Sequence, residues 1–214
     1  MNAVGRRSFA AALIVICLSA ATAASGQETA LANGVFLVAK PELLDPNFRE
    51  TVLLITQPQV GGGPIGVIVN RPLAVRLSKV VPGVGVVPEQ FDQVYRGGPV
   101  ARNQLLFLLR TTQRPERSLQ VLADVFMSGD VRLFERIVRG EMAVTAFRAY
   151  AGYSGWAPGQ LQAEIDRGGW HVIQADAEAI FATDSSTLWE KLIRRIDTRS
   201  TKVVAPIDAL AVVR

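Results

Sequence analysis

The pattern of hydrophobic and polar residues predicts short strands before it predicts any long helix. Residues 34–39 (GVFLVA) and 51–57 (TVLLITQ) are apolar, β-branched runs that flank the turn-rich segment PELLDPNFRE. A similar run at 66–70 (GVIVN) is stopped by an Arg-Pro pair. Runs of this length and composition are typical of buried strands. The same criteria predict further strands at 94–96, 105–110, 119–126, 144–150 and 170–173.

Helical periodicity occurs in three places. Asp130 can cap a helix that ends before Gly140, with its apolar residues on one face. A second helix is predicted after Pro158, and a third begins at residues 187–190, where Thr and Glu have the spacing of a capping box. Residues 73–80 predict one or two helical turns. Short strands with about three scattered helices predict an α+β domain on a mostly antiparallel or mixed sheet.

The glycine-rich stretch GGGPIG at residues 61–66 has the G-x-G-x-x-G spacing of a dinucleotide-binding loop. Such a loop holds phosphates only where it leads from a strand into a helix, whose first N–H groups meet the pyrophosphate. Here the glycines lie between two predicted strands, and Pro64 removes a backbone donor from the loop. We therefore expect a hairpin connection, and no other motif in the sequence predicts a cofactor.

The first 24 residues have the three parts of an export signal. An arginine pair (Arg6, Arg7) precedes an apolar run from Phe9 to Ala21, and small residues follow. Cleavage near residues 23–24 predicts a periplasmic or secreted protein. Two alternatives stay open: an uncleaved membrane anchor, although the run is shorter than the about 20 residues of a spanning helix, and a cytoplasmic protein.

Composition and charge exclude several classes of protein. With 49% hydrophobic and 20% charged residues, the chain has the composition of a globular domain. Its formal charge of +4 (23 basic and 19 acidic residues) falls to +2 when Arg6 and Arg7 are removed. No basic run indicates nucleic-acid binding. The single cysteine, Cys17, lies inside the export signal, so the mature chain has no thiol for a disulfide, a metal site or a nucleophile.

Catalytic chemistry has few candidate residues. Ser154 lies in GYSGW, which lacks the second glycine of a nucleophile elbow. The single histidine, His171, lies in a predicted strand, and a triad of Ser154, His171 and either Asp166 or Asp176 is formally available. We expect a structural His171 and no catalytic residue. We also expect no metal site, since the isolated carboxylates lack the spacing of a calcium loop.

Several motifs together resemble the bacterial AlgH/YqgE family. They are LVAKP with DPNF at residues 37–48, GVIVNRP at 66–72, YRGGPV at 95–100, and GYSGWAPGQL at 152–161 followed by Glu164. The resemblance covers roughly residues 31–195 in order. It implies a compact α+β domain at 31–196, after an export signal at 1–24 and before a tail at 197–214. It implies no established activity, although some members carry the label of transcriptional regulator.

The turns inside these motifs combine chain-bending residues with groups that form hydrogen bonds. One interpretation is structural, with the polar side chains satisfying turn backbones. The other is a pocket in which Arg71 and glycine N–H groups receive a small anionic or peptide-like ligand. The candidate ligand-binding residues are Asn70, Arg71, Gly97, Gly98, Tyr153, Ser154 and Trp156.

Three functions are compatible with these patterns. We favour a non-catalytic binding or accessory module of the cell envelope, with a small ligand or a protein as its partner. The first alternative is a hydrolase that uses Ser154 or a carboxylate. The second is a transcriptional regulator, which requires a cytoplasmic location, because an exported protein does not meet DNA there.

Overall fold

A computed structural model describes residues 34–56 and 63–203. The predicted export signal lies outside the described residues. The strands are β1 (Val35–Ala39), β2 (Val52–Thr56), β3 (Ile65–Ile68), β4 (Pro72–Arg76), β5 (Gln93–Arg96), β6 (Val100–Arg110), β7 (Leu119–Gln120), β8 (Val125–Ser128), β9 (Ala146–Gly155) and β10 (Trp170–Gln174). The helices are α1 (Leu77–Val80), the 3-10 helix η1 (Glu89–Phe91), α2 (Val131–Val138), α3 (Gln160–Asp166), α4 (Ala177–Ile180) and α5 (Leu188–Val203). Among the described residues, no helix is both long and apolar enough to cross a membrane.

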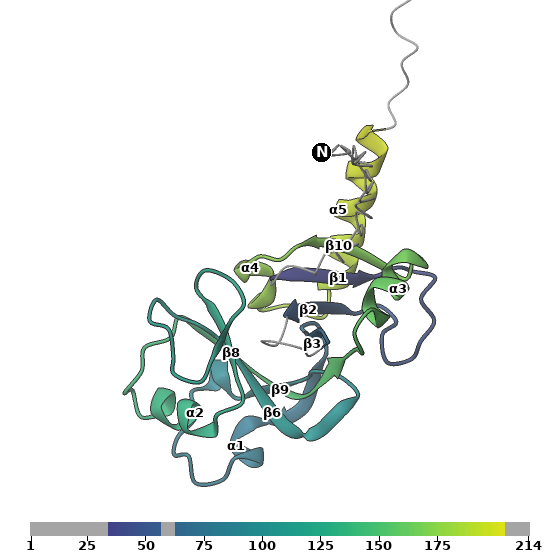
Figure 1. Ribbon diagram of the computed structural model, residues 1–214. Coiled ribbons are helices and arrows are strands. Elements are labelled where there is room, and N and C mark those ends of the chain that lie inside the picture. Colours follow the sequence, from purple (N-terminus) through teal and green to yellow (C-terminus); the bar gives the residue numbers. More distant parts are fainter. Residues whose placement is uncertain (1–33, 57–62, 204–214) are drawn as a thin grey trace, which may run out of the picture. The chain divides into compact units, whose positions relative to one another are not determined.

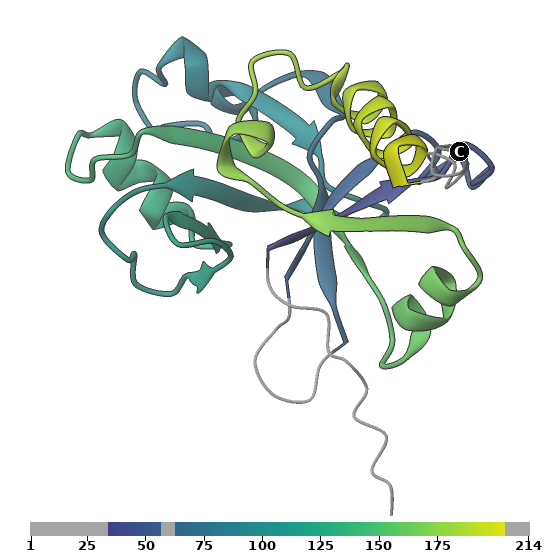
Figure 2. The same ribbon diagram turned by 90° about the horizontal axis from the view of Figure 1, so that it is seen from above.

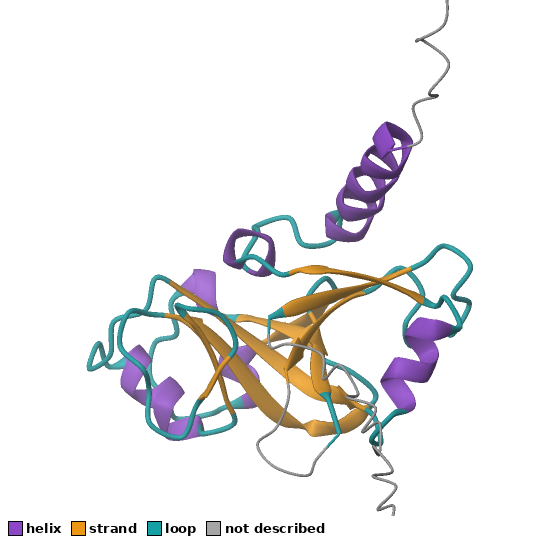
Figure 3. Ribbon diagram, turned by 45° about the horizontal axis from the view of Figure 1, so that its top comes forward, coloured by secondary structure: helices purple, strands orange, loops and turns teal. Residues whose placement is uncertain are grey.

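The strands form one connected sheet with the order β10-β1-β2-β3-β9-β6-β8-β7, and β5 joins β4 to β9 (Figures 1 and 3). Neighbours are antiparallel except β5 and β9, which are parallel. The α+β class with a mainly antiparallel sheet is confirmed. The glycine-rich loop joins β2 to the antiparallel β3, so it connects two strands as predicted.

Strand β9 belongs to both halves of the sheet. Its first part pairs with β5 and β6, and its last residues, Ser154 and Gly155, pair with β3. The change of partner coincides with Gly152, which has φ +72°, and with an irregularity in β6 at Ala101, which has φ +47°. A left-handed glycine beside a bulge bends a strand sharply. The bend lets β9 leave one half of the sheet and complete the other.

Three apolar clusters cover the two faces of this sheet. Helix α2 packs on one cluster through Phe134, and α3 packs on another through Leu161. The central cluster lies under α4 and α5, and α5 lies beside β1 (Figure 2). A 2.7 Å hydrogen bond from Trp189 Nε1 to the Ala39 carbonyl ties α5 to β1. Strands β1 and β2 are buried along their whole length, which explains their uninterrupted apolar sequences.

The structure corrects several predicted elements. The described residues contain five α-helices rather than about three, because α1 and α4 have four residues each and give no periodic pattern. Residues 72–76 form a strand before the helical turn, since they pair with β5 at an edge of the sheet. The predicted strand at 119–126 is divided into β7 and β8, and GYSG continues β9 instead of forming a turn.

Candidate functional site

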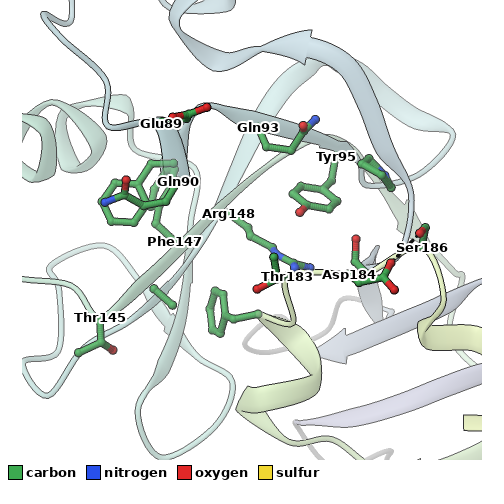
Figure 4. Close-up of a pocket in the computed structure, with 15 residues that line it drawn as sticks. Glu89, Gln90, Gln93, Tyr95, Thr145, Phe147, Arg148, Thr183, Asp184 and Ser186 are labelled. Atoms are coloured by element: carbon green, nitrogen blue, oxygen red, sulfur yellow. Dashed lines mark hydrogen bonds between the residues drawn. The ribbon is translucent and has the colours of Figure 1, made fainter. Parts of the chain in front are cut away.

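A cleft with a volume of about 520 Å³ opens beside the first residues of β9. Three segments line it: residues 89–95 from η1 and β5, residues 145–148 from β9, and residues 181–186 from the connection between α4 and α5 (Figure 4). Phe91, Phe147 and Phe181 supply apolar walls, whereas Gln93, Thr183 and Ser186 supply polar groups. A concave site of this size with a few polar groups has the form of a small-molecule site.

Arg148 is the buried cation of this cleft. Its side chain is only 5% exposed, although its sequence neighbours in β9 are apolar. One guanidinium nitrogen donates to the Val69 carbonyl at 3.1 Å, and the other donates to the Ala182 carbonyl. The guanidinium carbon lies 4.4 Å from the centre of the Tyr95 ring. Within the described parts of the chain, no carboxylate forms an ion pair with Arg148.

A buried guanidinium without a counter-anion is uncommon, because moving a charge out of water is costly unless an opposite charge compensates it. The two carbonyls and the Tyr95 ring compensate part of this cost. A guanidinium has five N–H donors, so the two hydrogen bonds to carbonyls leave three for other acceptors. Arg148 can therefore still receive an anion, and its planar geometry suits a carboxylate or phosphate.

The wall opposite β9 is held in place at both ends. Asp176 caps α4 by accepting from the backbone N–H of Ala179 at 2.7 Å. Glu178 on the same helix accepts from Arg110 of β6 at 2.6 Å. Beyond α4, the Arg148 hydrogen bond reaches Ala182. These contacts fix the segment that carries the polar residues of the cleft.

Behind the Tyr95 ring lies Tyr150, which is fully buried. The two ring centroids are 5.6 Å apart, and the Tyr150 hydroxyl has no hydrogen-bond partner. Burial raises the pKa of Tyr150 to about 12, with Arg148 opposing this shift. The hydroxyl is therefore protonated at neutral pH. It is a neutral group beside the guanidinium and does not serve as its counter-anion.

The rim of the cleft carries negative charge. Asp184 accepts from the hydroxyls of Thr187 and Ser186 at 2.7 and 2.8 Å. These two hydrogen bonds, the Thr187 bond first, lower the pKa of Asp184. Lys191 lies 3.8 Å from the same carboxylate. The exposed Glu89 lies on the η1 side. The cleft thus presents a buried cation below and carboxylates at its edge.

The predicted site residues Asn70 and Arg71 follow the end of β3. Asn70 is 2% exposed. Its side chain accepts from the Val52 N–H at 2.9 Å and donates to the Glu50 carbonyl at 3.0 Å. Arg71 is half-buried and donates to the Arg49 carbonyl at 2.6 Å. Arg71 has no ion pair within the described ranges, so its remaining donors are available.

The other predicted turn lies at the opposite end of β3. Gly66 pairs with Ser154, and the Arg71 carbonyl accepts from the Arg96 N–H at 2.8 Å. The Gly97 N–H donates to the Ala151 carbonyl at 2.9 Å. A Cβ on Gly98 would overlap the backbone of Tyr153. None of the seven predicted residues lines the 520 Å³ cleft or the other clefts found in the described residues. The structure therefore does not bring all seven predicted residues into one pocket.

Trp156 belongs to a packed aromatic network. It is 6% exposed and stacks on Phe48, with ring centroids 6.2 Å apart. Its indole N–H donates to the Glu164 carboxylate at 3.1 Å, and Trp170 donates to the same oxygen at 3.3 Å. This network explains the spacing of Trp and Glu in the motif, and it borders a second cleft of about 360 Å³.

Ser154 and His171 lie far apart. Ser154 is completely buried, and its hydroxyl has no hydrogen-bond partner. His171 lies on β10, and three strands, β1, β2 and β3, separate β10 from β9. At about 4.8 Å per strand, the two residues are roughly 15–20 Å apart. Burial, followed by the nearby Lys40, lowers the pKa of His171. This geometry does not form a serine-histidine pair.

Sequence reasoning missed Arg148 and Tyr95. The available signal was an arginine inside the apolar run AFRAYA, where a charged residue interrupts a buried strand. The partners of Arg148 come from β3, β5 and the α4–α5 connection, and no local pattern reveals them. Among the described residues, no group of three or more His, Cys, Asp or Glu side chains is placed to hold a metal ion.

Residues 36–201 match the family model described as AlgH-like. A UPF0301 protein of Thermobifida fusca is 35% identical over 172 residues, covering 76% of this chain and 86% of the relative. A UPF0301 protein of Chlorobaculum tepidum is 30% identical over 165 residues, covering 77% and 86%.

Two solved structures have the same fold. A crystal structure of a protein from Corynebacterium diphtheriae matches with a TM-score of 0.66 and 27% identity, over 77% of this chain and 87% of that one. The solution structure of the AlgH protein from Pseudomonas aeruginosa matches with a TM-score of 0.60 and 25% identity, over 85% and 95%.

Proposed function

We propose that this chain, which belongs to the AlgH-like family, is a non-catalytic binding module that holds a small anionic ligand in the Arg148 cleft. The single observation that carries the proposal is the buried guanidinium of Arg148, which has no carboxylate partner in the described parts of the chain and lines the 520 Å³ cleft. An anion would complete the charge balance that the fold leaves open.

Binding without catalysis is supported by the groups that surround Arg148. The carboxylate of Asp184 accepts hydrogen bonds from two hydroxyls, and no histidine lines the cleft. The Tyr150 hydroxyl is held in its neutral form by burial. A general base would need a pKa raised toward neutral pH, whereas the pKa of Asp184 is lowered.

Binding of 3-phenylpropionate, measured by isothermal titration calorimetry, tests this function. The compound offers one carboxylate for Arg148 and one ring for the phenylalanine walls. We expect binding to wild type and a loss of at least about tenfold in Arg148→Lys, because an ammonium does not reproduce a planar, bidentate contact. The control is Arg102→Lys, since Arg102 is exposed and makes no hydrogen bond or ion pair in the described residues.

Equal affinity in wild type and in Arg148→Lys would overturn the proposal, and so would an absence of binding to wild type. Thermal unfolding of each variant, followed by circular dichroism, establishes that Arg148→Lys is folded. If Arg148→Lys is unfolded, a crystal structure of wild type with 3-phenylpropionate replaces the binding measurement on that variant. Electron density for the carboxylate on Arg148 supports the proposal, and density elsewhere contradicts it.

We also propose that this module acts in the cell envelope. The proposal rests on the export signal at residues 1–24, with its arginine pair and apolar run. Fractionation of the native cells, followed by mass spectrometry of the purified chain, tests it. We expect a mature chain that begins near Ala24 in the periplasmic or secreted fraction. An intact chain from Met1 in the cytosol would contradict the proposal.

A further inference from the structure

The Arg148 cleft contains both a cation and carboxylates. This arrangement restricts the charges that its ligand can carry, in addition to the requirement for an anionic group. The cation lies at the bottom, where Arg148 is fixed by two carbonyls and the Tyr95 ring. The anions lie at the edge, where Asp184 and Glu89 reach solvent. Figure 4 shows Asp184 on the same side of the cleft as the guanidinium end of Arg148, and Glu89 further away.

We infer that the cleft selects a zwitterion of the α-amino-acid type, whose carboxylate binds Arg148, whose ammonium binds Asp184, and whose side chain lies on the phenylalanine walls. This inference rests on the proposed anion-binding function. It adds the second charged group of the ligand and its partner residue. A free amino acid carries both charged groups on one carbon, whereas a terminal residue of a peptide carries only one of them.

Asp184 is suited to bind an ammonium group. Its oxygens accept from Ser186 and Thr187, which fixes the carboxylate in one orientation. A carboxylate has about four acceptor positions, so two hydroxyl bonds leave room for another donor. Its side chain is 57% exposed, and the ammonium of Lys191 already lies 3.8 Å from it. An amine of the ligand would approach the same carboxylate from the cleft.

The charge arrangement disfavours polyanions. A phosphate ester or a dicarboxylate would place a second negative charge near Asp184 and Glu89, and like charges at short range repel. A simple monocarboxylate avoids this repulsion but leaves Asp184 without a partner from the ligand. An ammonium beside the carboxylate removes both disadvantages. The cleft walls formed by Phe91, Phe147 and Phe181 then favour an amino acid with an apolar side chain.

A matched set of compounds tests the inference by calorimetry. Phenylalanine and 3-phenylpropionate share the ring and the carboxylate and differ in the ammonium, whereas phenethylamine has the ammonium alone. We expect phenylalanine to bind wild type roughly fivefold more tightly than 3-phenylpropionate, the size of effect typical of a partly exposed ion pair. We expect phenethylamine to bind more weakly than either.

The variant Asp184→Asn separates the ammonium from the carboxylate contact. We expect it to abolish the preference for phenylalanine while the affinity for 3-phenylpropionate stays the same or rises. Asp166→Asn, on α3, is the control for an equal loss of charge away from the cleft. Thermal unfolding of Asp184→Asn establishes that it is folded, and the three compounds measured on wild type alone test the preference independently of the variant.

Each result bears on one level of the proposal. If 3-phenylpropionate binds in an Arg148-dependent manner and phenylalanine binds no more tightly, the inference is overturned and the anion-binding function stands. A preference for phenylalanine that survives in Asp184→Asn also overturns the inference. If neither carboxylate compound binds, the anion-binding function fails, and the inference fails with it.

Discussion

The guanidinium carbon of Arg148 lies 4.4 Å from the centre of the Tyr95 ring. The two residues come from β9 and β5, which are parallel neighbours, with Tyr95 paired to Tyr150 two residues beyond Arg148. Tyr95 therefore contacts both the buried cation and a second ring, Tyr150, whose centroid lies 5.6 Å from its own. This stack helps to keep Arg148, which lines the cleft, in one orientation.

Replacement of Tyr95 tests this stack. Tyr95→Leu keeps an apolar side chain but removes the ring that faces the guanidinium and the contact with Tyr150. We expect a loss of about 1–3 kcal/mol in the free energy of unfolding, since a desolvated cation–π contact and an aromatic pair each contribute about 1–2 kcal/mol. Urea denaturation measures it. Tyr95→Phe retains the ring and should cost less, and equal losses for the two variants would contradict this role.

The stability of the protein should depend on Asp184 in a specific pH range. The hydroxyls of Thr187 and Ser186 lower the pKa of Asp184 below its ordinary value of 3.8. A carboxyl group whose pKa is lower in the folded state stabilises that state above its unfolded pKa, and the contribution is lost as the pH falls through the lowered value.

We therefore expect Asp184→Asn to have a lower Tm than wild type at pH 7. The difference should shrink as the pH falls below about 4, where the wild-type carboxylate becomes protonated. Thermal unfolding of both proteins between pH 7 and the acid range, followed by circular dichroism, measures it. A difference in Tm that is constant with pH would show that the ionised carboxylate is not responsible.

Gly98 is expected to be intolerant of any side chain. A Cβ there would overlap backbone atoms of Tyr153 and Ser154, which cannot move without disturbing β9. We expect Gly98→Ala to cost about 3 kcal/mol, the upper end of the range for overpacking. The control Gly83→Ala has φ +84° but open space, so it should cost only the about 1–2 kcal/mol of left-handed strain. Denaturation with urea compares them, and equal costs would refute the packing explanation.

Ser154→Ala distinguishes a structural serine from a nucleophile. The Ser154 hydroxyl is buried without a partner, so its removal should leave the free energy of unfolding unchanged or raise it by about 1 kcal/mol. Ser128→Ala is the control. The Ser128 hydroxyl donates to the Arg117 carbonyl, so its removal should lower the free energy of unfolding by about 1 kcal/mol. Loss of an esterase, phosphatase or peptidase activity on Ser154→Ala would restore the hydrolase interpretation.

The sequence predicts the parts of this fold that depend on local patterns. Asp130 caps α2 as expected, accepting from the backbone N–H of Arg132, and Gly140 follows that helix with φ +73°. The hairpin at the glycine-rich loop follows from the strands on both sides. Thr187 differs from the prediction, since its hydroxyl donates to Asp184 and thereby shapes the cleft.

The candidate site could not be predicted in the same way. Motif residues such as Trp156 and Asn70 had both a structural and a ligand-binding interpretation, and their side chains make internal contacts with Glu164 and with backbone groups. Arg148 has no distinctive motif around it. Its importance depends on burial and on partners at Val69 and Ala182, which are 79 and 34 residues away in the chain. Only the three-dimensional structure brings them together.

NMR of the arginine side chains shows whether Arg148 receives the anion of a ligand. The Nε–H signal of Arg148 in wild type is identified by its absence in Arg148→Lys. During titration with 3-phenylpropionate, we predict that this signal shifts and saturates at the affinity measured by calorimetry, while the signal of the exposed Arg102 does not move. An Arg148 signal that stays unchanged while the compound binds would contradict the claim.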